Sequence, residues 1–171
     1  MPDGAAPPGG TRGARLGPHG KRAARKALGL EAALVDNRTM QVEALDPADG
    51  RSATVRVAGP AALLVAKTHK IHDRVESARE DRLDDKDASD VLRLMQTCPP
   101  ERVAATLRVL AAHPIAGGPT TTAIDAFEAL FGVRNGAGIE MAARALRIAM
   151  PEERVRAICL AYAADLTKSL R

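Results

Sequence analysis

The sequence predicts an α+β fold in which a small β-hairpin region is followed by a mostly helical bundle. Residues 39–45 and 52–58 alternate apolar and polar side chains or run β-branched, and the turn sequence DPADG lies between them. After Pro60, apolar residues recur at helical spacing in segments that Gly- and Pro-rich breaks separate. These two patterns indicate an antiparallel hairpin and then a bundle.

The amino-terminal segment, residues 1–19, is predicted to be a disordered basic arm. Gly and Pro are too dense in its sequence for regular structure. Several Arg and Lys residues near this end of the chain face a single acid, Asp3, and a basic arm of this kind can attract phosphate. No aromatic residue interleaves with them for base stacking, so we expect a solvated arm, with nucleic-acid binding as the alternative.

Residues 20–59 are expected to hold a short helix over 20–28 and then the hairpin. The sequence LEAALVD, residues 30–36, either extends that helix or forms a strand, and the pattern leaves both possibilities open.

The bundle region, residues 60–171, is predicted to hold six helices. Pro60 suits a first helical turn, and the breaks are CPP, HPIAGGP, GVRNGAG and Pro151. The segments with helical spacing are 60–76, 84–97, 100–112, 121–132, 138–148 and 151–169. The last helix has one buried stripe at i, i+3, i+4 and i+7, formed by Val155, Ile158, Cys159 and Tyr162. Core positions are also expected for Met95, Met141 and Met150.

Composition favours a globular cytoplasmic protein. Hydrophobic residues make up 46% of the chain and charged residues 27%. No apolar run approaches the ~18 residues of a membrane span, and residues 1–30 lack the apolar segment of a secretory signal. The two cysteines, Cys98 and Cys159, lie far apart and indicate neither a disulfide framework nor a zinc site.

Charged residues gather at the apolar edges of the first two bundle helices. Lys67 and Arg74 are seven residues apart and therefore lie on nearly the same face, with Lys70 beside them. On the next helix, Asp87 and Asp90 border the apolar face. If the two helices pack antiparallel, as a short connection favours, Lys67 or Arg74 meets Asp87 at the seam. Spacing alone leaves open whether this is a salt-bridged helical hairpin or a functional site.

The stretch GPAALLVAKTHKIHDR…DKDASDVLRLM resembles the carboxy-terminal part of nucleotidyltransferase-fold proteins of the AbiEii type. These are toxin-like members of abortive-infection and toxin–antitoxin systems. In that family, a helix of the form K-L-x-A-x-x-x-R precedes a helix of the form R/K-D-x-x-D-L. Lys67 and Arg74 match the basic positions of the first motif, and Lys86, Asp87 and Asp90 match the second. The resemblance covers about residues 30–97 and implies a partial nucleotidyltransferase-like region over 20–59.

The resemblance implies that Lys67 and Asp87 are catalytic and that Arg74, Lys70 and Asp90 bind substrate. A lysine in such a site neutralises triphosphate charge during transfer. The implied donor is a nucleoside triphosphate, the acceptor is an RNA or a protein, and an antitoxin is a possible partner.

The same resemblance implies Mg²⁺, which family members bind through a G-S/G…D-x-D motif near the amino terminus. Residues 1–60 contain no Asp-x-Asp and no Gly-Ser, and Asp46 and Asp49 have the wrong spacing. Glu43 is a weak candidate for a third carboxylate. We therefore assign no metal ligand in this chain and expect a truncated or catalytically incomplete nucleotidyltransferase-like protein.

Two other interpretations follow from the sequence. The chain is alternatively a non-enzymatic interaction module that binds a partner protein through its helical bundle. His69, His72 and Asp73 share one helix and offer at most three metal ligands, so we interpret them as surface residues.

Overall fold

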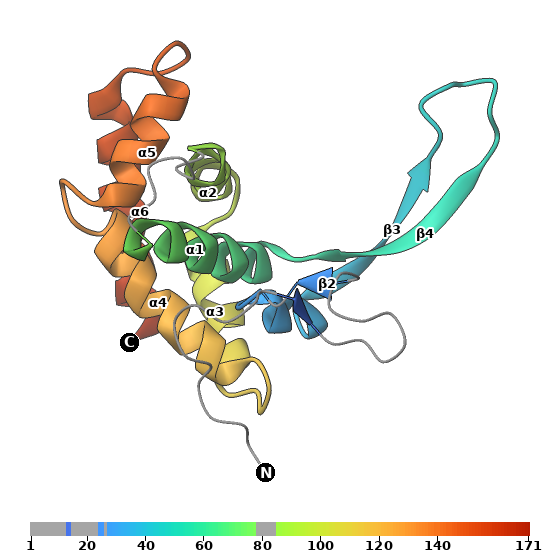
Figure 1. Cartoon of the computed structure of the whole chain (residues 1–171), viewed down its shortest axis with the longest axis horizontal. Helices are drawn as coiled ribbons and strands as arrows, with labels where there is room; N and C mark the ends of the chain where they lie inside the picture. The colour runs from blue at the N-terminus through green and yellow to red at the C-terminus, as the bar shows by residue number, and fades with distance from the viewer. Residues whose placement is uncertain (1–12, 15–23, 26, 78–84) are drawn as a thin grey trace.

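The fold consists of a projecting β-hairpin and a helical bundle, as the sequence predicts (Figure 1). The computed structural model describes residues 13–14, 24–25, 27–77 and 85–171. The predicted disordered arm lies outside these residues, except for Gly13 and Ala14. No helix in the described ranges is long and apolar enough to cross a membrane.

The structure corrects the prediction for the segment before the hairpin. A short strand, β1 (Gly13–Ala14), pairs antiparallel with β2 (Ala24–Arg25), so the described residues of 20–28 form no helix. LEAALVD contributes a 3₁₀ helix, η2 (Leu30–Leu34), which is neither of the two expected structures. Gly29 precedes it with a φ of 87°, a left-handed conformation that prevents a continuous helix from 20–28 into η2.

The hairpin prediction is confirmed. Strand β3 (Asn37–Glu43) begins and ends two residues before the predicted range, and β4 (Ser52–Ala58) matches its range. The strands pair antiparallel, with Met40 opposite Val55. In the turn, the Asp46 carboxylate accepts a hydrogen bond from the Ala48 backbone N–H at 2.9 Å.

Asp36 links the base of the hairpin to the first bundle helix, α1 (Pro60–Glu76). Its carboxylate accepts the Ala62 backbone N–H at 2.8 Å, and its carbonyl accepts the Gly59 N–H at 2.8 Å. A Cβ at Gly59 would lie 1.9 Å from an Asp36 oxygen, so only glycine fits this close approach. The Asp36 side chain therefore caps α1 and fixes its start.

Five further helices follow α1. They are α2 (Lys86–Thr97), α3 (Pro100–Ala111), α4 (Gly117–Phe131), α5 (Ala137–Leu146) and α6 (Glu152–Leu170). All boundaries lie within two residues of the prediction except the start of α4, which lies four residues early. Pro119 sits in the first turn of α4, where its missing N–H costs no helical hydrogen bond. Gly117 lies so near the Ala111 carbonyl that a Cβ would stand 2.6 Å from that oxygen.

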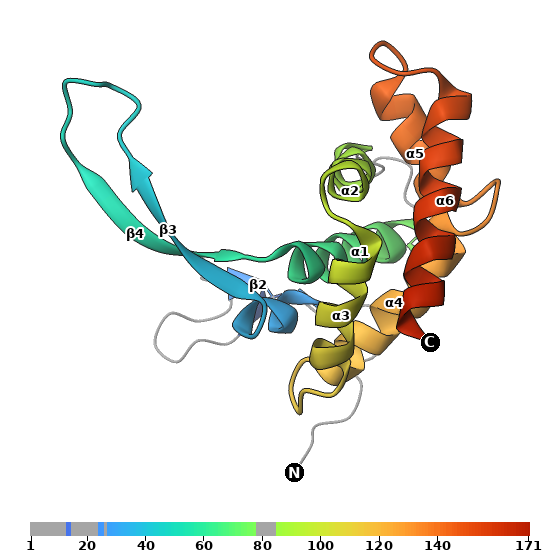
Figure 2. The same ribbon diagram turned by 180° about the vertical axis from the view of Figure 1, so that it is seen from behind.

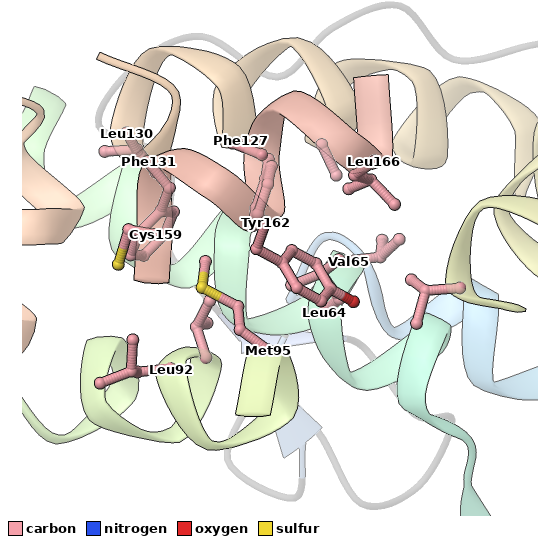
Figure 3. Packing of buried hydrophobic residues seen from close by; sticks show 14 of the residues in the cluster. Leu64, Val65, Leu92, Met95, Phe127, Leu130, Phe131, Cys159, Tyr162 and Leu166 are labelled. Carbon is pink, nitrogen blue, oxygen red and sulfur yellow. The ribbon is translucent and has the colours of Figure 1, made fainter. Parts of the chain in front are cut away.

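Small and aliphatic side chains dominate the core, with a few larger residues at its centre (Figure 3). Phe127 and Phe131 stack at a centroid distance of 5.3 Å. The predicted stripe on α6 is confirmed, because Val155, Cys159 and Tyr162 are buried and Ile158 is partly buried. Figure 2 shows α6 along one side of the bundle, where it packs against α2, α3, α4 and α5.

The methionine predictions also hold. Met95 and Met141 are buried, and Met150 packs against the same core. Ala32 of η2 belongs to this core as well. The predicted boundary between residues 59 and 60 therefore separates two types of structure that share one hydrophobic core.

Candidate functional site

Six charged side chains from α1 and α2 meet in one group, which we call the α1–α2 cluster: Lys67, Lys70, Arg74, Asp87, Asp90 and Arg93. The three α1 cations occupy positions i, i+3 and i+7 and so face the same side of that helix. The sequence predicts that Lys67 or Arg74 meets Asp87, and in the structure both of them do.

The expected antiparallel packing of the two helices is wrong. In Figure 1, α2 is seen nearly end-on while α1 lies across the view, so the helices cross steeply. The buried stripe of α2 explains where its acids lie, since Ala88, Val91, Leu92 and Met95 all face the core. Asp87 lies one turn before Val91 and is therefore drawn into the seam beside α1.

Asp87 is the centre of the cluster. Its Oδ1 accepts a hydrogen bond from the Lys67 ammonium at 2.7 Å. Its Oδ2 contacts the Lys70 ammonium at 2.6 Å and the Arg74 guanidinium at 2.7 Å. The Asp87 side chain is only 2% exposed, so this carboxylate has exchanged its water shell for three cations.

Asp90 forms the second anchor of the cluster. Its Oδ2 accepts a hydrogen bond from Lys67 at 2.8 Å, and its Oδ1 accepts one from Arg93 at 2.7 Å. Lys67 therefore bridges both carboxylates of α2. This double contact holds the lysine in one position.

The electrostatics of the cluster stabilise the charged forms of all three central groups. Burial raises the pKa of Asp87, but the hydrogen bonds from Lys67 and Lys70 outweigh it and leave the pKa below its usual value. The hydrogen bond from Lys67 lowers the pKa of Asp90. Burial lowers the pKa of Lys67, yet its bonds to Asp87 and Asp90 raise it overall.

The cluster carries an excess of positive charge. Its four cationic side chains surround two carboxylates, which leaves two positive charges in excess within these six residues. The excess is accessible, because the Lys70 side chain is 50% exposed and Arg93 is also exposed. Such an arrangement attracts an anion, and ammonium and guanidinium groups are the usual protein ligands of phosphate.

Arg144 of α5 and Asp85 support the cluster, although neither is a site residue predicted from the sequence. The Arg144 guanidinium donates hydrogen bonds to both Asp85 oxygens, at 3.1 and 2.8 Å. This contact ties α5 to the residue before α2 and so helps to hold Asp87 in place. Because the two residues are 59 positions apart, no local spacing indicates their pairing.

The cluster does not fit a magnesium ion. Both of its carboxylates are already bound to ammonium or guanidinium groups, and the site has a net positive charge. Glu43 is the last residue of β3, on the hairpin that projects from the bundle, so it adds no carboxylate to the cluster (Figure 1). In the described part of the chain, no group of three or more His, Cys, Asp or Glu side chains is arranged to hold a metal.

His69 has a structural contact away from the cluster. Its Nε2 lies 2.7 Å from the Pro119 carbonyl oxygen of α4. The contact joins α1 to the first turn of α4, so His69 is part of the packing between these helices. His69 and His72 are both partly buried, so the predicted surface position holds only in part.

Comparisons with known proteins do not assign the chain to a family, since no family model, curated protein or solved structure matches it.

Proposed function

We propose that this chain is a nucleotidyltransferase-like protein of the AbiEii type whose α1–α2 cluster binds the phosphate groups of a nucleoside triphosphate. One observation carries the proposal: the residues named by the resemblance converge from two helices into a cluster with accessible positive charge. A cytoplasmic location and an antitoxin partner belong to the same proposal.

Each residue has a distinct role in this proposal. Lys67 is held by Asp87 and Asp90 and supplies a fixed positive charge. Lys70 is the most exposed of the three α1 cations. Its ammonium can leave Asp87 and bind a phosphate oxygen, while Asp87 retains its contacts with Lys67 and Arg74. Asp87 is a positioning residue, because it aligns the three cations without facing solvent.

For this chain, the proposed activity is nucleotide binding. Transfer to an RNA or protein acceptor needs carboxylates that hold Mg²⁺, and the cluster does not provide them. A form of the protein that carries these carboxylates would use the same cluster to neutralise the charge of the leaving phosphates.

Isothermal titration calorimetry with the four common ribonucleoside triphosphates tests binding, and inorganic tripolyphosphate separates phosphate contacts from base contacts. Lys70→Ala removes an exposed cation and leaves Asp87 paired, so we expect about tenfold weaker binding without loss of the fold. Lys168→Ala, an exposed lysine in the last turn of α6, is the matched control. Equal affinity for both variants, or no binding by the parent chain, would refute the proposal.

The second candidate function is a non-enzymatic interaction module. The observation in its favour is the β-hairpin, which exposes Met40, Val42 and Val55 to solvent. Thermal unfolding with each triphosphate and Mg²⁺ separates the two candidates, because a module without a nucleotide site shows no shift in Tm with any of them.

A further inference from the structure

The β-hairpin has one apolar face and one polar face. Residues that are paired across the two strands point to the same side, and successive pairs alternate. The apolar face, which we call the hairpin face, consists of Met40, Val42, Ala53, Val55 and Val57. The opposite face consists of Thr39, Gln41, Glu43, Ser52, Thr54 and Arg56.

The hairpin face is uncovered over most of its length. Met40, Val42, Ala53 and Val55 are all exposed, Val42 at 49%, and only the base of the hairpin is partly buried. Figure 1 shows the strands extending away from the bundle. A two-stranded hairpin is marginally stable in water unless its apolar side packs against something, so this face needs an occupant.

The charges of the hairpin indicate what that occupant is. Arg38 lies at the base, on the same side as the hairpin face, since it pairs with Val57. Arg38 has no ion-pair partner among the described residues. The turn at the other end carries Asp46, which has no ion-pair partner among the described residues, and Asp49, which is paired with Arg51 of the same turn. Each hairpin therefore has a cation without an ion-pair partner at its base, Arg38, and a carboxylate without one at its tip, Asp46.

We propose that a second copy of this chain covers the hairpin face. Two hairpins stacked face to face and running in opposite directions place the base of each against the tip of the other. A two-fold axis at the Val42–Ala53 pair sets Arg38 opposite Asp46 of the second copy, because both lie four residues from Val42. Such an interface is isologous: Val42 meets Val42 of the second copy, Met40 lies over its Ala44, and Arg38 and Asp46 match at both ends.

The size of the face limits the strength of this dimer. A ladder of seven residue pairs is roughly 23 Å long and two strands are roughly 10 Å wide, from standard strand dimensions. The area of the face, roughly 230 Å², is well below the ~800 Å² that each partner buries in a standard stable interface. The dimer is therefore weak, with dissociation expected at roughly tens to hundreds of micromolar.

Sedimentation velocity over roughly 5–500 µM protein tests the association in this range. The parent chain should shift from monomer to dimer with concentration. Val42→Glu places two like charges together at the two-fold axis and should weaken the dimer at least about tenfold. Thr39→Glu, on the opposite face and across from Arg56, is the matched control and should dimerise like the parent. Asp46→Asn keeps the acceptor for the Ala48 N–H and should weaken the dimer several-fold.

A cross-link tests the arrangement without disturbing the hairpin. In a Cys98→Ser background, Val42→Cys should form a covalent dimer on oxidation with copper–phenanthroline, because the two-fold axis brings the two positions together. Thr39→Cys, on the polar face, should remain monomeric under the same treatment. A parent chain that stays monomeric at every concentration, or equal cross-linking at both positions, overturns the proposal. Neither outcome bears on nucleotide binding, which uses a different part of the molecule.

Discussion

Removing the Asp87 carboxylate should destabilise the protein more than any other single change in the α1–α2 cluster. In Asp87→Ala, three cations lose a shared partner that is almost fully buried. Breaking a buried ion pair from one side costs about 3–5 kcal/mol, and a hydrogen bond to a charged group contributes about 1.5–3 kcal/mol. The cations can partly turn to water, so we expect the lower end, a loss of about 3 kcal/mol in the free energy of unfolding.

Urea unfolding followed by circular dichroism measures this loss. For a chain of this length, the lowering of Tm is about 2–4 °C per kcal/mol, so Tm should fall by about 6–12 °C. Asp90→Ala is the matched comparison, because Asp90 is more exposed and binds fewer cations, and it should cost about 1 kcal/mol. Losses below about 0.5 kcal/mol for Asp87→Ala would show that the cluster is not coupled to folding.

The effect of Asp87 should also depend on pH in a defined direction. The pKa of Asp87 is lower in the folded protein than in the unfolded chain. Its contribution to the free energy of unfolding is therefore complete above the pKa of the unfolded state, about 3.9, and is lost as the pH falls through the pKa of the folded state. The difference in stability between the parent and Asp87→Asn should therefore stay constant near neutral pH and shrink below about pH 4. Lys67 has a raised pKa, so its contribution is lost only at alkaline pH, above about 10.4.

Two further predictions concern the core. Gly138→Ala would place a Cβ 2.5 Å from the Phe131 ring and should lower the free energy of unfolding, measured in urea, by about 1–3 kcal/mol. The Cβ of Gly118→Ala meets no atom within 4 Å, so this variant should be neutral or stabilising by up to about 1 kcal/mol. Equal effects of the two glycine variants would contradict the packing of α5 on α4. Burial raises the pKa of the Cys159 thiol to about 12, so Ellman's reagent should modify the half-buried Cys98 first and Cys159 only on unfolding. Rapid release of two equivalents from the native protein would contradict the burial of Cys159.

The bundle could be predicted closely from the sequence because Gly and Pro mark where its helices end. Pro60 and Pro100 begin helices where the pattern placed them. The start of α4 was missed because the Gly-Gly-Pro sequence is typical of a break, and only the packed structure shows Gly117 against Ala111. The helix expected over 20–28 is also absent from the described residues of that range. Local propensity favours it, but the pairing of β2 with β1 depends on contacts between separate segments, which local propensity does not include.

The site could be predicted only in part. Helical periodicity places Lys67 and Arg74 on one face, and both contact Asp87 although the helices do not pack antiparallel as expected. The steep crossing of α2 over α1 was not predictable, and it is this crossing that brings Asp90 to Lys67. Periodicity also gives no information on function, which rests on the resemblance of the motifs and on the excess charge of the cluster.

The most direct test of the central claim is to locate the nucleotide by NMR. Backbone amide spectra of the isotopically labelled chain would be recorded during titration with ATP, with Lys70→Ala as the control. We predict that the largest shifts lie in residues 67–74 and 86–93 and that they are reduced in the variant. Shifts confined to other parts of the chain, or none at millimolar ATP, would contradict nucleotide binding by the α1–α2 cluster.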